Sequence, residues 1–238
     1  MSSKVLFWDF DGTLGHRRGG KWSSALLEAL HEIEPDCDVT LDDLKPLVSS
    51  GFPWHHPDVA HTHLHTPELW WSSLRKQVIE KAYRSLGYHE HAAQRLALIA
   101  QETYIDVKKW ALYEDALPVL ERLKEQGWIH AVISNHVPEL QDILNYLGLT
   151  DFISVIINFS LEGYEKPHPQ LYQIALQKVG NPRTVWMIGD NLHADVLGAE
   201  NVGIKGILVR TEEKRAAFQA KDLYEIPNIL ARVEQQEP

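Results

Sequence analysis

The strongest constraint on the fold is an apolar run near the N-terminus that ends in two carboxylates and a glycine. The run Val5–Trp8 suits a strand that is buried on both faces, as in a parallel sheet. Asp9 and Asp11 follow it one residue apart, and Gly12 comes next. Alternation along an extended chain sends both carboxylates to one side, where they repel each other unless a cation lies between them. The pattern therefore predicts a divalent metal at the carboxyl end of a buried strand, rather than a solvated Asp-x-Asp-Gly turn.

Beyond about residue 110, the chain alternates short apolar segments with amphipathic ones. The apolar runs predict strands at 130–134, 152–157, 184–188 and 204–209. Helices are expected at 117–126, with Asp115 as a candidate cap, and at 138–147 and 169–179. This alternation predicts an α/β fold, a Rossmann-like doubly wound parallel sheet whose ligands bind at the carboxyl ends of the strands.

Residues 22 to about 109 have a different character, with helical spacing and no strong strand signal. A first helix is expected from Trp22 to about Ile33. The series Thr66-Pro67-Glu68 is a helix start signal, and Gly87 is a stop signal. A third helix is expected over about 91–110. We therefore predict a core made of residues 1–15 and 110–238, interrupted by an α-helical cap of residues 16–109.

Composition limits the class of protein. With 238 residues, 44% of them hydrophobic, the chain can bury a full core. Its formal net charge of −10 disfavours a nucleic acid or an anionic membrane as partner. Cys37 is the single cysteine, and no apolar stretch approaches the roughly 20 residues of a membrane span. We expect a cytoplasmic protein with no nucleic-acid or membrane partner, and nothing in the sequence indicates its oligomeric state.

Further polar residues follow the other predicted strands. Ser134 and Asn135 come directly after one strand, where a hydroxyl, an amide and backbone N–H groups can donate to phosphate oxygens. Lys166 precedes a proline-stiffened loop and becomes the cation for an anionic substrate if the aspartates converge there. Asp190 closes a buried strand as Asp9 does, so it can supply a second metal carboxylate.

Asp195 lies five residues after Asp190, near the start of the next expected helix. A carboxylate there is favoured by the helix N-terminus, so Asp195 can be a simple first-turn acid. Alternatively, it pairs with Lys166 and orients it. The sequence leaves both interpretations open.

In their order along the chain, these groups resemble the four signature motifs of the haloacid dehalogenase (HAD) superfamily, in its phosphatase branch. The motifs span residues 9 to 195, so the resemblance covers the whole predicted core. The helical insertion directly after the first motif resembles the family's C1-type cap. The matching residues are Asp9 to Leu14, Ser134 and Asn135, Lys166 and Pro167, and Gly189, Asp190 and Asn191 with Asp195.

The resemblance implies a hydrolase of phosphoric monoesters, a Mg²⁺-dependent phosphatase acting on a small phosphorylated metabolite. Asp9 is then the nucleophile that forms an aspartyl-phosphate, and Asp11 is the general acid and afterwards the base. By analogy with the family, Mg²⁺ is bound by Asp9, Asp190 and Asp11, the last through its backbone carbonyl. This set suits an ion that keeps waters and a phosphate oxygen among its ligands.

The same resemblance assigns residues to the phosphoryl group. Ser134 and Lys166 count as catalytic because they neutralise charge on the group being transferred. Asn191 and Asp195 support the site. Arg17 and Arg18 follow the first motif closely enough to reach a second anionic group on the substrate, or they are solvated loop residues. Phosphate binding is assigned to Gly12, Ser134, Asn135 and Lys166, with Arg17 and Arg18 as further candidates.

Other functions fit parts of the pattern. A phosphomutase keeps the same four motifs and passes the phosphoryl group to a hydroxyl instead of water. A dehalogenase fits poorly, because that branch needs no acid at the position of Asp11. Phosphonate hydrolysis would need a cap lysine, and neither Lys21 nor Lys76 has a recognisable setting. From another class, a non-catalytic binding or regulatory protein with a HAD fold would not need Asp9, Asp11, Lys166 and Asp190 intact.

A histidine-rich segment at 55–65 does not belong to these motifs. Its alternate histidines can bind a transition metal, although no cysteine or carboxylate completes such a site. We favour the interpretation that this segment is a polar cap loop. A role in substrate recognition is a third possibility. Trp54, just before it, is a candidate to stack on a ligand.

Overall fold

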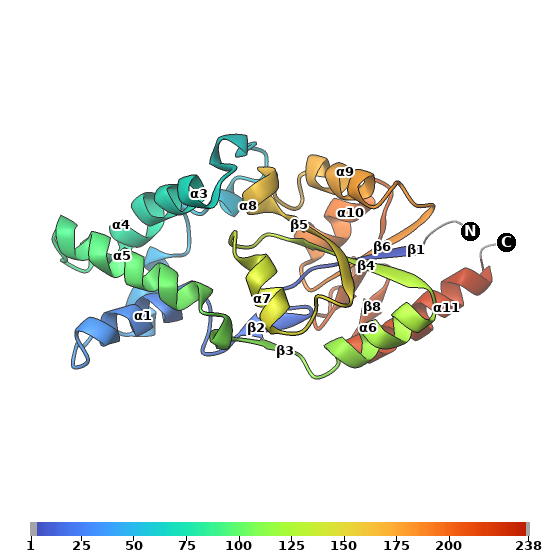
Figure 1. The fold of residues 1–238 in the computed structure, drawn as a ribbon, viewed down its shortest axis with the longest axis horizontal. Helices are drawn as coiled ribbons and strands as arrows, with labels where there is room; N and C mark the ends of the chain where they lie inside the picture. The colour runs from blue at the N-terminus through green and yellow to red at the C-terminus, as the bar shows by residue number, and fades with distance from the viewer. Residues whose placement is uncertain (1–3, 237–238) are drawn as a thin grey trace.

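The computed structural model describes residues 4–236, apart from the side chains of Trp54 and Gln236, so the stacking role considered for Trp54 lies outside the described part. Six strands form one parallel sheet with the order β5-β4-β1-β6-β7-β8, and the N-terminal strand lies inside it (Figure 1). Residues 5–8 of that strand are fully buried, as their apolar run predicts. The strands are β1 (Lys4–Trp8), β4 (Trp128–Ser134), β5 (Ile153–Asn158), β6 (Thr184–Gly189), β7 (Lys205–Val209) and β8 (Gln219–Ala220).

Helices cover both faces of the sheet, which confirms the predicted α/β architecture. Figure 1 shows α9 and α10 on one side of the sheet and α6 and α11 on the other. No helix in the described part of the chain is both long enough and apolar enough to cross a bilayer. The core helices are α6 (Ala116–Glu125), α7 (Leu140–Tyr146), α8 (Phe159–Glu162), α9 (Pro169–Lys178), the π-helical turn η5 (Leu192–Leu197), α10 (Gly198–Glu200), the 3₁₀ turn η6 (Leu223–Glu225) and α11 (Ile226–Gln236).

A helical cap lies at one end of the molecule, on the left in Figure 1, and its position in the chain matches a C1-type cap. It leaves and re-enters the core through a two-stranded antiparallel pair, β2 (Gly15–Arg17) and β3 (Trp110–Leu112). Its elements are α1 (Trp22–Ile33), α2 (Leu41–Leu47), the 3₁₀ turns η1 (Pro53–His55) and η2 (Thr62–Leu64), α3 (Pro67–Leu74), the π turn η3 (Arg75–Ile79), α4 (Glu80–Ser85), α5 (Glu90–Ile105) and the 3₁₀ turn η4 (Val107–Lys109).

Several expected boundaries were wrong at this cap–core junction. The third cap helix ends at Ile105 rather than near Trp110, because Asp106 accepts a hydrogen bond from Lys108 N–H and starts a new turn. Trp110 instead begins β3, where it pairs with Arg17. Residues Gly15–Arg17, of which Arg17 was considered as a solvated loop residue, are therefore a strand.

Asp115 was expected to cap α6, and its side chain makes no capping hydrogen bond. Its carboxylate accepts hydrogen bonds from the guanidinium of Arg210 at 2.5 Å and from Leu223 N–H at 2.8 Å. Asp115 is almost fully buried, so these partners satisfy both of its oxygens. Asp115 therefore joins the residue after β7 and the first residue of η6 to the start of α6. The predicted cap at Thr66 is confirmed, since its hydroxyl accepts from Leu69 N–H.

The cap also contacts the core away from the β2–β3 pair. The indole N–H of Trp71 in α3 donates to both carboxylate oxygens of Glu139, at 2.9 and 3.1 Å. The backbone N–H of His61 donates to Gly163 O at 2.7 Å. These two contacts attach the cap to the loop after β4 and to the loop after α8.

Candidate active site

A cavity of about 300 Å³ lies at the carboxyl ends of β1, β4 and β6, next to the cap. This is the position predicted for a ligand in a parallel sheet. Residues from both the core and the cap line it: Asp9, Asp11, Lys21, Trp22, Tyr104, Ser134, Asn135, His136, Val137, Lys166, Asp190, Asn191, Ala194 and Asp195.

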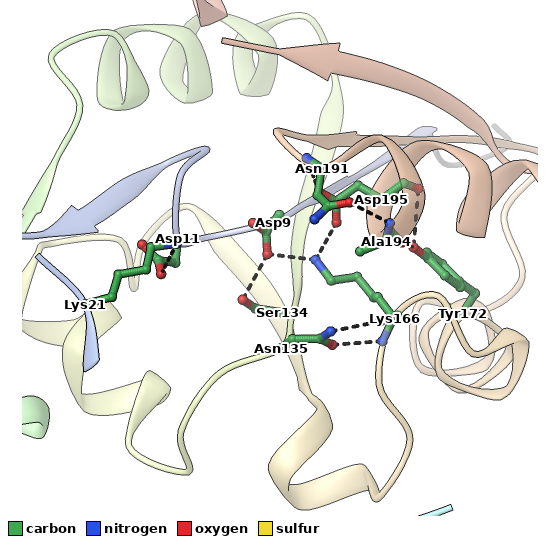
Figure 2. Close-up of polar contacts among 10 residues, drawn as sticks. All are labelled: Asp9, Asp11, Lys21, Ser134, Asn135, Lys166, Tyr172, Asn191, Ala194 and Asp195. Atoms are coloured by element: carbon green, nitrogen blue, oxygen red, sulfur yellow. Dashed lines mark hydrogen bonds and ion pairs between the residues drawn. The ribbon is translucent and has the colours of Figure 1, made fainter. Parts of the chain in front are cut away.

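Asp9 lies at the centre of the site (Figure 2). Its N–H donates to Ile188 O at 2.9 Å, so its backbone is held by the neighbouring strand β6. Its Oδ1 accepts hydrogen bonds from Ser134 Oγ at 3.0 Å and from Lys166 Nζ at 2.7 Å. The other carboxylate oxygen makes no hydrogen bond with these two groups. Asp9 therefore has one oxygen held by donors and a second one that can face a ligand.

Lys166 is buried between two carboxylates. Its ammonium lies 2.7 Å from Asp9 Oδ1 and 2.6 Å from Asp195 Oδ1. Burial alone would lower the pKa of Lys166, but the charges of Asp195 and Asp9 together raise it above its ordinary value. The ammonium is therefore charged at neutral pH.

Asn135 acts on the backbone of Lys166 rather than pointing a free amide at the cavity. Its Nδ2 donates to Lys166 O at 2.9 Å, and its Oδ1 accepts from Lys166 N–H at 2.8 Å. This two-point contact joins the loop after β4 to the loop that carries the lysine. Asn135 thus positions Lys166, while Ser134 contacts Asp9 directly.

Asp195 pairs with Lys166, which was one of the two interpretations left open by the sequence. Its other oxygen accepts from Asn191 N–H at 3.0 Å. Asn191, not Asp195, caps η5, because its side chain accepts from the N–H groups of His193 and Ala194. A Cβ at Gly189 would overlap the Asp195 carboxylate, so the glycine allows this close approach.

Three carboxylates come together as a candidate metal centre. Asp9, Asp190 and Asp195 each offer one oxygen, and these oxygens lie within 4.8 Å of one another. Burial, and next the charge of Asp9, raise the pKa of Asp190 to about 6. The ionised form of this carboxyl group is thus disfavoured, and a cation bound beside it would stabilise that form. Since Lys166 takes one oxygen of Asp195, Asp9 and Asp190 are the pair best placed to hold a divalent cation. The side chain of Asp11 is not part of this cluster.

Within residues 4–236, this is the only group of three or more such side chains that could hold an ion. The histidine-rich cap segment therefore offers no metal centre in the described structure.

Gly12 allows Asp190 to reach the centre. Gly12 has a φ of +104°, and a Cβ there would overlap the Asp190 carboxylate. We expect Gly12→Ala to displace Asp190 and to weaken the binding of a divalent cation at this centre, titrated with Mg²⁺, by roughly 10- to 100-fold. Gly148→Ala is the matched control, because Gly148 also has a positive φ, +76°, but a Cβ there meets nothing within 4 Å. Equal Mg²⁺ titration curves for the two variants would contradict this role.

Asp11 faces the cap side of the cavity. Its Oδ2 lies 3.0 Å from Lys21 Nζ, and its Oδ1 is buried without a hydrogen-bond partner. Sequence reasoning named Lys21 only as a cap lysine without a setting, and did not identify Trp22, Tyr104 or His136 as cavity residues. These residues come from the cap termini and from the loop after β4, and no local motif marks them. Lys76 is exposed and does not line the cavity.

The structure does not bring Arg17 or Arg18 to the cavity. Arg17 is buried, and its guanidinium donates to Glu28 and to the backbone oxygens of Gly20 and Thr103. It therefore ties β2 to α1 and α5. Arg18 is exposed.

Glu165, next to Lys166, is fully buried, and neither of its carboxylate oxygens has a hydrogen-bond partner. Burial raises its pKa from 4.5 to about 8. The folded protein then keeps this proton over a range where the unfolded chain releases it, so stability falls as pH rises from about 4.5 to about 8.

Glu165→Gln removes this titration. We expect the variant to gain stability relative to the wild type as pH rises through that window, by roughly 2–4 kcal/mol in total. Urea unfolding at pH 5 and pH 9 measures the change. Glu121→Gln, at an exposed position, is the control and should show no such trend. A difference between Glu165→Gln and wild type that stays constant with pH would contradict a buried neutral glutamate.

Comparisons with known proteins agree with this site. A family model for haloacid dehalogenase-like hydrolase matches residues 3–203. Haloacid dehalogenase-like hydrolase domain-containing protein 3 of Mus musculus is 26% identical over 220 residues, which are 90% of this chain and 84% of that protein. Phosphoserine phosphatase of Thermus thermophilus is 29% identical over 165 residues, which are 66% of this chain and 65% of that protein.

Solved structures show the same fold. The HAD-hydrolase YfnB of Bacillus subtilis, described as bound to magnesium, aligns over 97% of this chain and 100% of its own with a TM-score of 0.71 and 18% identity. A 2-haloacid dehalogenase from Pseudomonas syringae aligns over 97% of this chain and 99% of its own with a TM-score of 0.67 and 20% identity. With the family model covering most of its length and the motif residues gathered at one cavity, this chain belongs to the haloacid dehalogenase-like hydrolase family.

Proposed function

We propose that this protein is a Mg²⁺-dependent phosphatase that hydrolyses a small phosphomonoester through an aspartyl-phosphate on Asp9. The observation that carries the proposal is a second carboxyl group, Asp11, beside the Asp9 nucleophile in one cavity. Phosphoryl transfer needs a proton donor for the leaving alkoxide, whereas release of a halide does not. The phosphoserine phosphatase of Thermus thermophilus supports this choice among hydrolases.

The side chains suggest a two-step reaction. Asp9 attacks phosphorus with the oxygen that Ser134 and Lys166 leave free, and the ester P–O bond breaks. The leaving oxygen takes a proton from Asp11. Water then attacks the aspartyl-phosphate while Asp11 accepts its proton, and the P–O bond to Asp9 breaks to release inorganic phosphate.

The groups around Asp9 neutralise the negative charge of the phosphoryl group. Lys166 and Ser134 provide donors beside Asp9, where negative charge accumulates on the phosphoryl oxygens. Bound between Asp9 and Asp190, Mg²⁺ would neutralise charge on both the carboxylates and the phosphoryl group. The magnesium-bound hydrolase of Bacillus subtilis supports this ion. The volume of about 300 Å³ favours a small metabolite over a macromolecular substrate.

Hydrolysis of p-nitrophenyl phosphate tests the proposal. We expect turnover with Mg²⁺, loss of turnover on chelation, and recovery when Mg²⁺ is added back. Indifference to the chelator would contradict a metal-dependent phosphatase. Halide release from a 2-haloacid, without phosphate release from any ester, would show that the protein is a dehalogenase and not a phosphatase.

A further inference from the structure

Lys21 is a cap-side cation at the edge of the catalytic cavity. It directly precedes α1, and its side chain is 64% exposed. Its Nζ lies 3.0 Å from Asp11 Oδ2. Burial alone would lower the pKa of Lys21, but Asp11 raises it above the usual value, so the ammonium is charged at neutral pH.

Lys21 and Lys166 lie on opposite sides of Asp9 (Figure 2). Lys166 is buried and already has two carboxylates within 2.7 Å. Lys21 has one, and it remains open to the cavity and to solvent. The two lysines are therefore not equivalent: Lys166 belongs to the phosphoryl end, and Lys21 is available to another group.

The contact between Lys21 and Asp11 indicates that this other group belongs to the leaving group of the substrate. In the proposed reaction, Asp11 donates its proton to the oxygen of the leaving group, so that oxygen lies about 3 Å from Asp11. Lys21 Nζ lies at a similar distance, 3.0 Å, from Oδ2 of the same carboxylate. The ammonium is therefore at most about 8 Å from the leaving oxygen, a distance that a short carbon chain ending in a carboxylate or phosphate can span when that anion accepts a hydrogen bond from the ammonium.

The aromatic and histidine walls on this side carry no further cation. Trp22 and Tyr104 stack with ring centroids 3.8 Å apart and an interplanar angle of 7°, and form a flat aromatic surface. His136 is buried, and burial lowers its pKa to about 4, so it is neutral. Among the described residues that line the cavity, Lys21 and Lys166 are the two cations.

From this placement we propose that Lys21 binds a second anionic group, a carboxylate or a phosphate, on the leaving group of a short phosphomonoester. The proposal rests on the phosphatase function above and adds the substrate class to it. An anionic leaving group competes with Asp11 for Lys21, and when bound it places the leaving oxygen beside Asp11. A neutral leaving group of the same length lacks this contact.

Matched phosphonates test the binding step without turnover. We expect 3-phosphonopropionate or propane-1,3-diylbisphosphonate to bind the Mg²⁺-loaded protein on the order of 10- to 100-fold more tightly than propylphosphonate, measured by calorimetry. Whichever of the two binds more tightly identifies the second anion as carboxylate or phosphate. Lys21→Met should remove this preference, with a smaller loss of affinity for propylphosphonate than for the two probes that carry a second anion, whereas Lys21→Arg should retain most of the preference. Lys81→Met, an exposed cap lysine outside the cavity, should behave as wild type.

Two results would overturn the proposal. One is equal affinity of the wild type for all three probes. The other is an equal loss for all three in Lys21→Met, which would place Lys21 at the phosphoryl group or make it only a partner of Asp11.

Turnover of 3-(phosphonooxy)propionate and propyl phosphate separates this proposal from the phosphatase assignment. Hydrolysis of both esters with equal kcat/KM keeps the phosphatase function and refutes the anion site. A Lys21-dependent binding preference without hydrolysis of either ester keeps the anion site and refutes the phosphatase function.

Discussion

Asp9→Asn is expected to reduce phosphomonoester hydrolysis by roughly 10⁴- to 10⁶-fold, the largest effect of any single substitution. The amide is a poor nucleophile, yet it has nearly the same shape, and its oxygen can still accept from Ser134 and Lys166. The fold should therefore be retained while the chemistry is lost. Steady-state kinetics with p-nitrophenyl phosphate and Mg²⁺ measure the loss.

Acid-quenched mass spectrometry adds a second readout. The wild type should carry one phosphoryl group on the peptide that contains Asp9, and Asp9→Asn should carry none. Asp142→Asn, at an exposed position of α7, is the control and should match the wild type in both assays. An active Asp9→Asn variant, or a phosphoryl group on another residue, would rule out Asp9 as the nucleophile.

Lys166→Met is expected to lower both stability and activity. Removing the ammonium leaves the buried carboxylates of Asp9 and Asp195 without their shared partner, which typically costs about 3–5 kcal/mol of unfolding free energy. Loss of the charge beside the phosphoryl group should also lower kcat by roughly 10²- to 10³-fold. Urea unfolding and steady-state kinetics measure the two effects.

A double variant separates them. Adding Asp195→Asn to Lys166→Met removes one of the unpaired charges, so part of the stability should return while kcat stays low. If Lys166→Met unfolds at the same urea concentration as the wild type, the buried pair does not stabilise the fold. If the double variant recovers activity, Lys166 acts on structure and not on the phosphoryl group.

The core of the fold and the centre of the site could be predicted because each signal was local. An apolar run followed by a carboxylate marks Asp9 and Asp190 separately, and a parallel sheet brings such ends to the same edge. The structure confirms that these two carboxyl groups, far apart in the chain, lie close enough to share an ion. The pairing of Asp195 with Lys166 was one of two alternatives, since both fit a carboxylate near a helix start.

The cap side of the site could not be predicted, because it depends on contacts between distant segments. Arg17 was expected either to reach a second anionic group of the substrate or to be a solvated loop residue, and only the position of Glu28 and α5 shows that its guanidinium is buried in contacts within the cap. Lys21 reaches Asp11 because β2 pairs with β3, and helical periodicity that continued to Trp110 concealed that strand. Contacts of this kind, between segments that are far apart in the chain, leave no local pattern in a single sequence.

The contacts of the cap with Glu139 and Gly163 have a mechanical consequence. Glu139 lies in the loop that begins with Ser134 and Asn135, and Gly163 lies in the loop that leads to Lys166. The cap is thus fastened to the same two loops that present the donors around Asp9. Any outward movement of the cap would have to break the contacts of Trp71 and His61 with those loops, so the position of the cap and the alignment of the donors around Asp9 are physically linked.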